Sequence, residues 1–344
     1  MKNNFITSIR VPWHFYLCLL LILVLSMITL SSGDIDISLS EILLVFTGKG
    51  SSFYNQVIFE LRLPRLLTAI FSGASLALCG LLLQTYFQNP LAGPFVLGIH
   101  SGSAFFVSLW ILAGQSLGIN FAINYSGMNT IIASWIGSLT VMAILFTISV
   151  KIPGKVILLV IGLLLGYFSG ALINILVALG DPHEIKTFLT WSMGSFHRTS
   201  ISELKIMVFI LFISTLASLF IARGLNLIFV GEVFSKSLGI NPKKIKIIVL
   251  IITSLLAAVV TSFCGPVAFV GMISPHFCRL ILKTENHFQL IPYTVAMGAL
   301  IAIFADLLSS FILPFGMPLN SVLGLLGAPF IILFLMKNKI GSYA

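Results

Sequence analysis

The chain has 344 residues, of which 58% are hydrophobic and 8% charged, and its formal net charge is +9. A soluble domain carries about 25% charged residues, so this composition excludes a soluble enzyme, a nucleic-acid-binding domain and a disordered chain. The mean hydropathy is +1.11, and long apolar runs predict an all-α, polytopic membrane protein. An outer-membrane barrel would instead show short segments of alternating hydrophobicity.

The apolar runs predict about ten membrane-spanning helices within a single membrane domain over residues 1–344. The first run follows Lys2 and Arg10 without a small-residue cleavage site, so we expect an uncleaved helix. The eighth run contains Gly271 and Pro275, which favours a broken or partial helix there. The predicted spans are 14–31, 64–87, 96–114, 128–150, 156–179, 203–222, 246–264, 267–282, 289–311 and 319–336.

The distribution of charge predicts the orientation of these spans. With the N-terminus in the cytoplasm, thirteen of the nineteen Lys and Arg residues fall on the cytoplasmic side, beside only two acids. The other six lie on the outer side with eight acids. Membrane proteins concentrate Lys and Arg in cytoplasmic loops, so both termini are predicted to be cytoplasmic.

Motifs for nucleotide or metal binding are missing from the sequence. No G-x-x-x-x-G-K-[ST] loop is present, so any ATP that drives this protein must bind another subunit. The six histidines are scattered and form no i,i+4 pair, which argues against a metal site on one helix. We therefore expect no metal and no cofactor to be bound by this chain.

Two arginines flank Pro64 at the outer start of the second predicted span. Arg62 and Arg65 are three positions apart, so on a helix they share a face. They could be interfacial arginines whose side chains reach toward the headgroups. They could also bind carboxylates on an external partner, because arginines are uncommon on the outer side of a membrane protein.

Glycines occur at every fourth position of the fifth predicted span, at Gly162, Gly166 and Gly170. Small residues at this spacing let helices approach closely. Packing within one subunit explains the pattern, and so does a position at a dimer seam or along a path for cargo.

The cationic loop between the sixth and seventh spans is also patterned. Val233, Phe234 and Leu238 alternate with polar residues around one helical turn, and Gly239 can end that turn. This pattern predicts a short amphipathic helix on the inner face of the membrane. It could lie on lipid headgroups or insert into a groove on a partner.

Short motifs occur in a fixed order along most of the chain. The N-terminal set is Arg62–Arg65, Gly73–Ala77, Gly80 with Gln84, Asn89–Ala92, and Gly98 with Ser101 and Gly102. The C-terminal set is Ser237–Ile240, Gly265–Pro266, Phe269–Gly271, Pro275–His276, Ala305–Asp306 and Gly327–Pro329. In this order and spacing the sequence resembles the FecCD-like permease family of ABC importers for iron-siderophore, haem and vitamin B12.

The resemblance implies a type II ABC importer permease fold with ten transmembrane helices in the bacterial cytoplasmic membrane. It implies a homodimer that works with two cytoplasmic ATP-binding subunits, which carry the ATP and Mg, and with an extracytoplasmic substrate-binding protein. The chain itself would be non-catalytic. It would move a large metal chelate by alternating access, and the sequence does not choose among ferric siderophore, haem and cobalamin.

The resemblance also assigns roles to residues of this sequence. Arg62 and Arg65 match the arginines that dock the substrate-binding protein. The segment that couples to the ATPase matches Gly231, Glu232, Ser237, Leu238, Gly239 and Asn241. The fifth and tenth helices line the path at the dimer axis, which places along it Gly162, Gly166, Gly170, Gly324, Gly327 and Pro329.

Three positions depart from the family's pattern. Members often carry an arginine four residues after the Ala-Asp acid, where this chain has Ser310, so docking to one lobe of the binding protein is expected to be weaker. His100 stands where a small polar residue is usual, and His197 follows a Gly-Ser turn. We interpret both as ordinary histidines at helix ends, with haem or iron ligation as the alternative.

Two other classes of membrane protein compete with this reading. A self-contained, ion-coupled secondary transporter needs intramembrane acids, and Asp306 is the one candidate in the sequence. An integral membrane enzyme would need clustered polar residues at one depth, and the sequence shows no such cluster. Both are weaker predictions than the permease.

Overall fold

The computed structural model describes residues 13–33, 35–113, 127–151, 155–311 and 317–341. Over these residues the secondary structure is helical throughout and contains no strand. The helices are α1 (Trp13–Ser31), α2 (Leu39–Phe46), α3 (Ser52–Gln56), a π-helical turn η1 (Val57–Arg62), α4 (Leu63–Phe87), α5 (Ile99–Ala113), α6 (Gly127–Lys151), α7 (Lys155–Leu179), α8 (Pro182–Ser192), α9 (Ile201–Val230), α10 (Glu232–Ser237), α11 (Pro242–Cys264), α12 (Val270–Leu282), α13 (His287–Phe311) and α14 (Leu319–Gly341).

The predicted spans are found as helices among the described residues. Seven segments are long and apolar enough to cross a membrane, and they correspond to α1, α4 with its preceding turns, α6, α7, α9, α11 and α13. Three shorter apolar helices, α5, α12 and α14, complete the set of ten. The all-α prediction is therefore confirmed, and the remaining short helices lie in the connections.

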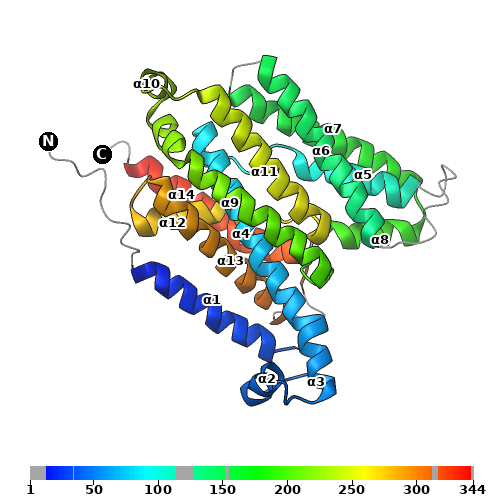
Figure 1. The fold of residues 1–344 in the computed structure, drawn as a ribbon. Helices are drawn as coiled ribbons and strands as arrows, with labels where there is room; N and C mark the ends of the chain where they lie inside the picture. Colours follow the sequence, from blue (N-terminus) through cyan, green and yellow to red (C-terminus); the bar gives the residue numbers. More distant parts are fainter. Residues whose placement is uncertain (1–12, 34, 114–126, 152–154, 312–316, 342–344) are drawn as a thin grey trace.

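The bundle is organised around α4 (Figure 1). Every residue of α4 from Ser72 to Phe87 is buried, because α4 packs against α9, α11, α12 and α13. A second group of helices, α5, α6 and α7, lies beside α8, and α1 lies along α13. We call the end of the bundle that carries α2, α3 and α8 the α8 end, and the opposite end the α10 end.

The predicted boundary of the sixth span needs correction. The sequence predicts an end at 222, before the cationic loop, but α9 continues to Val230. Leu225 and Ile228 are fully buried, and a Cβ at Gly224 would lie 2.8 Å from Ile245 of α11. Apolar packing between α9 and α11 therefore extends the helix past the charge at Arg223.

The eighth span is a short helix, as predicted, but Gly271 and Pro275 do not break it, because both lie inside α12 (Val270–Leu282). The chain leaves α11 at Gly265 and becomes helical again only at Val270, three residues later than the predicted start. Gly265 has φ +75° and Phe269 has φ +64°, conformations that a helix does not contain. Non-helical backbone at membrane depth must be shielded by protein, and the break from 265 to 269 is packed inside the bundle.

Candidate functional site

Arg65 is held by α13 at the α8 end. Its Nε lies 2.8 Å from Asp306 Oδ2, and its Nη2 donates to the Ser310 hydroxyl. Asp306 is nearly buried, whereas the Arg65 side chain keeps 16% of its surface exposed. An acid within a membrane helix usually has a partner, and here Arg65 is that partner.

Arg62 has a different environment. The side chain is 9% exposed, and its guanidinium donates to the carbonyls of Leu30 and Ser31 at the end of α1 and to that of Ile35 in the following segment. Arg62 and Arg65 bond to different elements, because Arg62 reaches the end of α1 and Arg65 reaches α13. In this structure Arg62 satisfies backbone carbonyls that the end of α1 leaves open.

A cavity of about 410 Å³ opens beside the Arg65–Asp306 ion pair. Its lining includes His197 and Arg198 of the turn after α8, together with Asp306 and Ser310. Burial lowers the pKa of His197, the nearby Arg65 lowers it further, and Asp306 raises it in part. In the described residues no group of three metal-ligating side chains includes His197.

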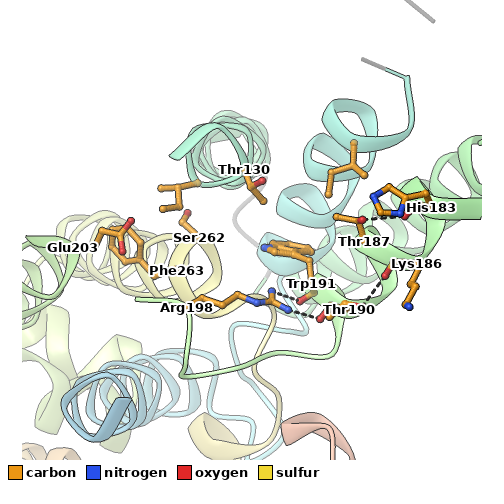
Figure 2. Close-up of a pocket in the computed structure, with 12 residues that line it drawn as sticks. Thr130, His183, Lys186, Thr187, Thr190, Trp191, Arg198, Glu203, Ser262 and Phe263 are labelled. Atoms are coloured by element: carbon orange, nitrogen blue, oxygen red, sulfur yellow. Dashed lines mark hydrogen bonds between the residues drawn. The ribbon is translucent and has the colours of Figure 1, made fainter. Parts of the chain in front are cut away.

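A second cavity, of about 420 Å³, lies between α8, α6 and α11. Figure 2 shows Trp191 and Arg198 side by side in it, with Ser262 and Phe263 of α11 on the opposite wall. The Arg198 guanidinium donates to the carbonyls of Thr190 (2.6 Å) and Trp191 (3.3 Å). A cation at the C-terminus of a helix is favourable, so Arg198 stabilises the end of α8.

The middle of the bundle depends on close backbone approach. A Cβ at Gly80 of α4 would lie 1.6 Å from the carbonyl oxygen of Gly271 on α12, and one at Gly73 would lie 2.2 Å from that of Gly298 on α13. His276 of α12 also bonds the Pro90 carbonyl at 2.9 Å. The helix break at 265–269 and the turn after α4 are therefore packed around α4.

The glycines of α7 differ from one another in their surroundings. A Cβ at Gly162 would lie 2.7 Å from Leu97, and Gly166 has Ser101 of α5 nearby, whereas Gly170 has open space. Gly162 therefore packs within this chain, which supports the first of the two interpretations for that residue. For Gly166 and Gly170, a position on the path or dimer seam stays a prediction.

Two of the residues predicted on α14, Gly324 and Gly327, face the helix break. A Cβ at Gly327 would lie 2.8 Å from Phe269, and Gly324 has the same ring at 3.8 Å. Pro329 lies within α14 and is exposed, close to the exposed Leu325 and Leu326. One face of α14 therefore packs against the break at 265–269, and another face is exposed at the surface of the chain.

The segment predicted to couple to a partner forms α10 at the opposite end of the bundle. Gly231 and Gly239 flank it with φ +154° and +81°, so both turns favour glycine. Asn241 then caps α11, because its side chain accepts from the backbone N–H groups of Lys243 and Lys244. Gly231 and Gly239 therefore bound α10, and Asn241 marks the start of the next helix.

Exposed apolar side chains lie on α10 and at its C-terminal end, beside the exposed Lys236 and Ser237. Val233 is 84% exposed and Leu238 is 54% exposed, and Phe234 lies beside them at the surface. Ser235 alone points inward and is fully buried. Exposed apolar side chains on a short helix mark a surface that a partner or a lipid headgroup layer covers.

A polar network that the sequence did not reveal lies near the C-terminal end of α4. Arg279 of α12 bonds Glu285 at 3.0 Å and Gln84 of α4 at 2.7 Å. Gln84 in turn donates to the Met272 carbonyl. The network links α4 to α12 beside a cavity of about 510 Å³ that His276 also lines. Residues nearly 200 positions apart give no local signal of such a contact.

His100 lies inside the bundle, where its Nδ1 is bonded to the Thr261 hydroxyl. That hydroxyl also donates to the Ala257 carbonyl, so the ring nitrogen serves as the donor to Thr261. The ring is 1% exposed and packs near Phe95. Its position is that of an internal helix-end histidine, while ligation of a cargo metal stays untested.

Comparison with known proteins identifies the family to which this chain belongs. The family model described as the FecCD transport family matches residues 19–337. The chain belongs to the FecCD transport family. It is therefore a permease subunit of an ABC importer, a multi-pass membrane protein without catalytic activity of its own, whose family associates with ATPase subunits and substrate-binding proteins.

Individual FecCD relatives are similar over nearly their whole length. The chain is 31% identical to the hemin permease HmuU of Yersinia pestis (96% of each chain) and 32% identical to the iron(3+)-hydroxamate permease FhuG of Bacillus subtilis (92% and 95%). It is 31% identical to the molybdate permease MolB of Haemophilus influenzae (94% and 95%). A solved metal-chelate type ABC transporter in an inward-facing conformation matches with a TM-score of 0.84, at 28% identity over 95% of this chain and 99% of that one.

Proposed function

We propose that this FecCD permease imports a metal chelate such as a ferric siderophore, haem or cobalamin. The observation that supports this cargo class is the full-length similarity to hemin and iron-hydroxamate permeases, together with the match to a metal-chelate type transporter. The similarity to a molybdate permease makes a small oxyanion the second candidate.

The α10 end is proposed to be cytoplasmic and to bind two ATPase subunits that carry ATP and Mg. The positive-inside distribution of charge supports this orientation, and the exposed apolar face of α10 supplies a docking surface. Two copies of the chain are proposed to form the complex, with a path between them for cargo. The inward and outward packings then differ in energy, and ATPase closure shifts the balance.

The α8 end is proposed to receive the substrate-binding protein. Arg65 is the docking residue in this proposal, because it is partly exposed beside an open cavity. Arg62 is proposed to act there only if it leaves the carbonyls of α1. Asp306 is already paired with Arg65, which weakens its case as the coupling acid of a secondary transporter.

Uptake by the purified complex tests this function. The permease, its ATPase and its binding protein are reconstituted in vesicles, and uptake of labelled ferric hydroxamate, haem, cobalamin and molybdate is compared. We expect ATP-dependent uptake of one of the three chelates, and native mass spectrometry should give two copies of each membrane and ATPase subunit. Molybdate uptake alone would contradict the chelate cargo, and uphill transport by the permease alone would contradict the ABC mechanism.

A further inference from the structure

Three stretches of backbone meet at the α8 end around one side chain, Asn320 of α14. The first is the end of α8 with the turn that follows it. The second is the break between α11 and α12. The third is the start of α14 itself. None of the sequence motifs includes Asn320.

The Asn320 amide bonds backbone groups of both other stretches. Its Nδ2 donates to the Pro266 carbonyl at 2.6 Å and to the Ser192 carbonyl at 3.4 Å. Its Oδ1 accepts from the Ala268 N–H at 3.1 Å, and its own backbone N–H donates to the Met193 carbonyl at 3.3 Å. One residue thus satisfies four backbone groups that end or interrupt helices.

The two stretches also contact each other directly, with no room for a side chain between them. The Ser195 N–H donates to the Cys264 carbonyl at 2.8 Å. A Cβ at Gly265 would lie 2.5 Å from the Trp191 carbonyl, and one at Gly194 would lie 2.9 Å from the Pro266 carbonyl. Both glycines have positive φ, a conformation that a side chain would strain.

On these contacts we propose that Asn320 is a positioning residue for transport, which clamps α8, the break at 265–269 and α14 into one unit. The proposal rests on the proposed function. Opening a path at the α8 end by alternating access requires α8 or α14 to move. Because the bonds of Asn320 join all three stretches, we expect the three to move together, and the break to carry the motion to α12.

The test replaces Asn320 with aspartate. An ionised carboxylate still accepts from Ala268 N–H, but it cannot donate to Pro266 and Ser192, and it repels both carbonyl oxygens. A protonated carboxyl regains one donor. The control variant is Ser321→Asp, which adds the same charge at the next, exposed position.

Transport is measured in vesicles with equal pH on both sides, from pH 7.5 to 5.5. We expect Asn320→Asp to transport at least tenfold more slowly than wild type at pH 7.5, while ATP hydrolysis continues, and to recover as the pH falls. Wild type and Ser321→Asp give the background from the titratable and charged groups around the clamp, which include Arg65, His197, Arg198, Glu203, Cys264 and Asp306. Equal transport at pH 7.5, or a loss that is the same at every pH, would overturn the clamp.

Hydrogen exchange in the purified complex gives a readout that needs no cargo. The Ser195 amide does not contact Asn320, so its exchange reports separation of the two stretches. At pH 7.5 we expect this exchange to rise at least tenfold in Asn320→Asp and to stay unchanged in Ser321→Asp. Unchanged exchange at Ser195 would refute the clamp. Failure of the wild-type complex to move any cargo would instead refute the proposed function. Hydrogen exchange at Ser195 would still test the clamp.

Discussion

Arg62 and Arg65 illustrate how two like residues, three positions apart, acquire different roles. Arg62 turns toward α1 and satisfies three carbonyls there, so its charge is used inside the chain. Arg65 is shared between Asp306 and solvent. A carboxylate from a docking protein would therefore meet Arg65 first, and would compete with Asp306 for its guanidinium.

At this scale we predict the effect of removing the Arg65 charge. The double variant Arg65→Gln with Asp306→Asn removes both charges, so no buried carboxylate is left unpaired. We expect the Kd of the binding protein for the complex to rise about tenfold, or about 1.4 kcal/mol, as measured by surface plasmon resonance. Lys49→Gln, which removes an exposed cation at the same end, should change the Kd little. An unchanged Kd in the double variant would reject Arg65 as a docking residue.

At the scale of helices, α4 is the element around which the others pack, and glycine permits its closest contact. Gly80 lies against the Gly271 backbone of α12, whereas Gly170 of α7 faces open space. Both are helical glycines, so alanine has the same intrinsic effect at both and differs only in packing.

The pair Gly80→Ala and Gly170→Ala tests this packing. The new methyl group at 80 would overlap the Gly271 carbonyl and should destabilise the bundle by about 1–3 kcal/mol. At 170 the higher helix propensity of alanine should stabilise by up to about 1 kcal/mol. The apparent Tm of each purified variant is compared with wild type. An equal fall in both would show that the α4–α12 contact does not decide stability.

At the scale of the whole molecule, α10 and the α8 end lie at opposite ends of one bundle, and transport requires them to communicate. The connecting elements are α9 and α11, which flank α10 in sequence and pack on α4. The network of Arg279, Gln84 and Glu285 links α12 to the C-terminal part of α4. Force applied at α10 can therefore reach the break at 265–269 through packed helices.

A charge on the exposed apolar side chains at α10 should weaken binding of the ATPase subunits to the permease. Leu238→Glu places a carboxylate at an exposed position, so the fold should persist while the interface loses apolar area. We expect co-purification with the ATPase to fall at least tenfold. Leu43→Glu of α2, equally exposed at the other end, is the control. Normal co-purification and transport by Leu238→Glu would refute the coupling role of α10.

Much of this architecture follows from the sequence, because each apolar run must form a helix in a membrane to satisfy its own backbone. The ten spans and the short α10 are of this kind, since Gly239 acts locally. The eighth span is short for a different reason from the predicted one, because Gly271 and Pro275 lie inside α12 and the chain breaks at 265–269. The end of α9 was predicted too early, because its last turns are held by α11 and not by their own composition.

The sequence by itself therefore determined the class of protein and the number of spans, but not every position where a helix stops. The tertiary structure alone decided which side chains meet: Arg65 with Asp306, 241 positions away, and Asn320 with Ser192, 128 positions away. The physical reason is range. Hydrophobic periodicity and backbone conformation act over a few neighbouring residues, whereas a hydrogen bond between distant segments exists only after the helices have packed and aligned donor with acceptor.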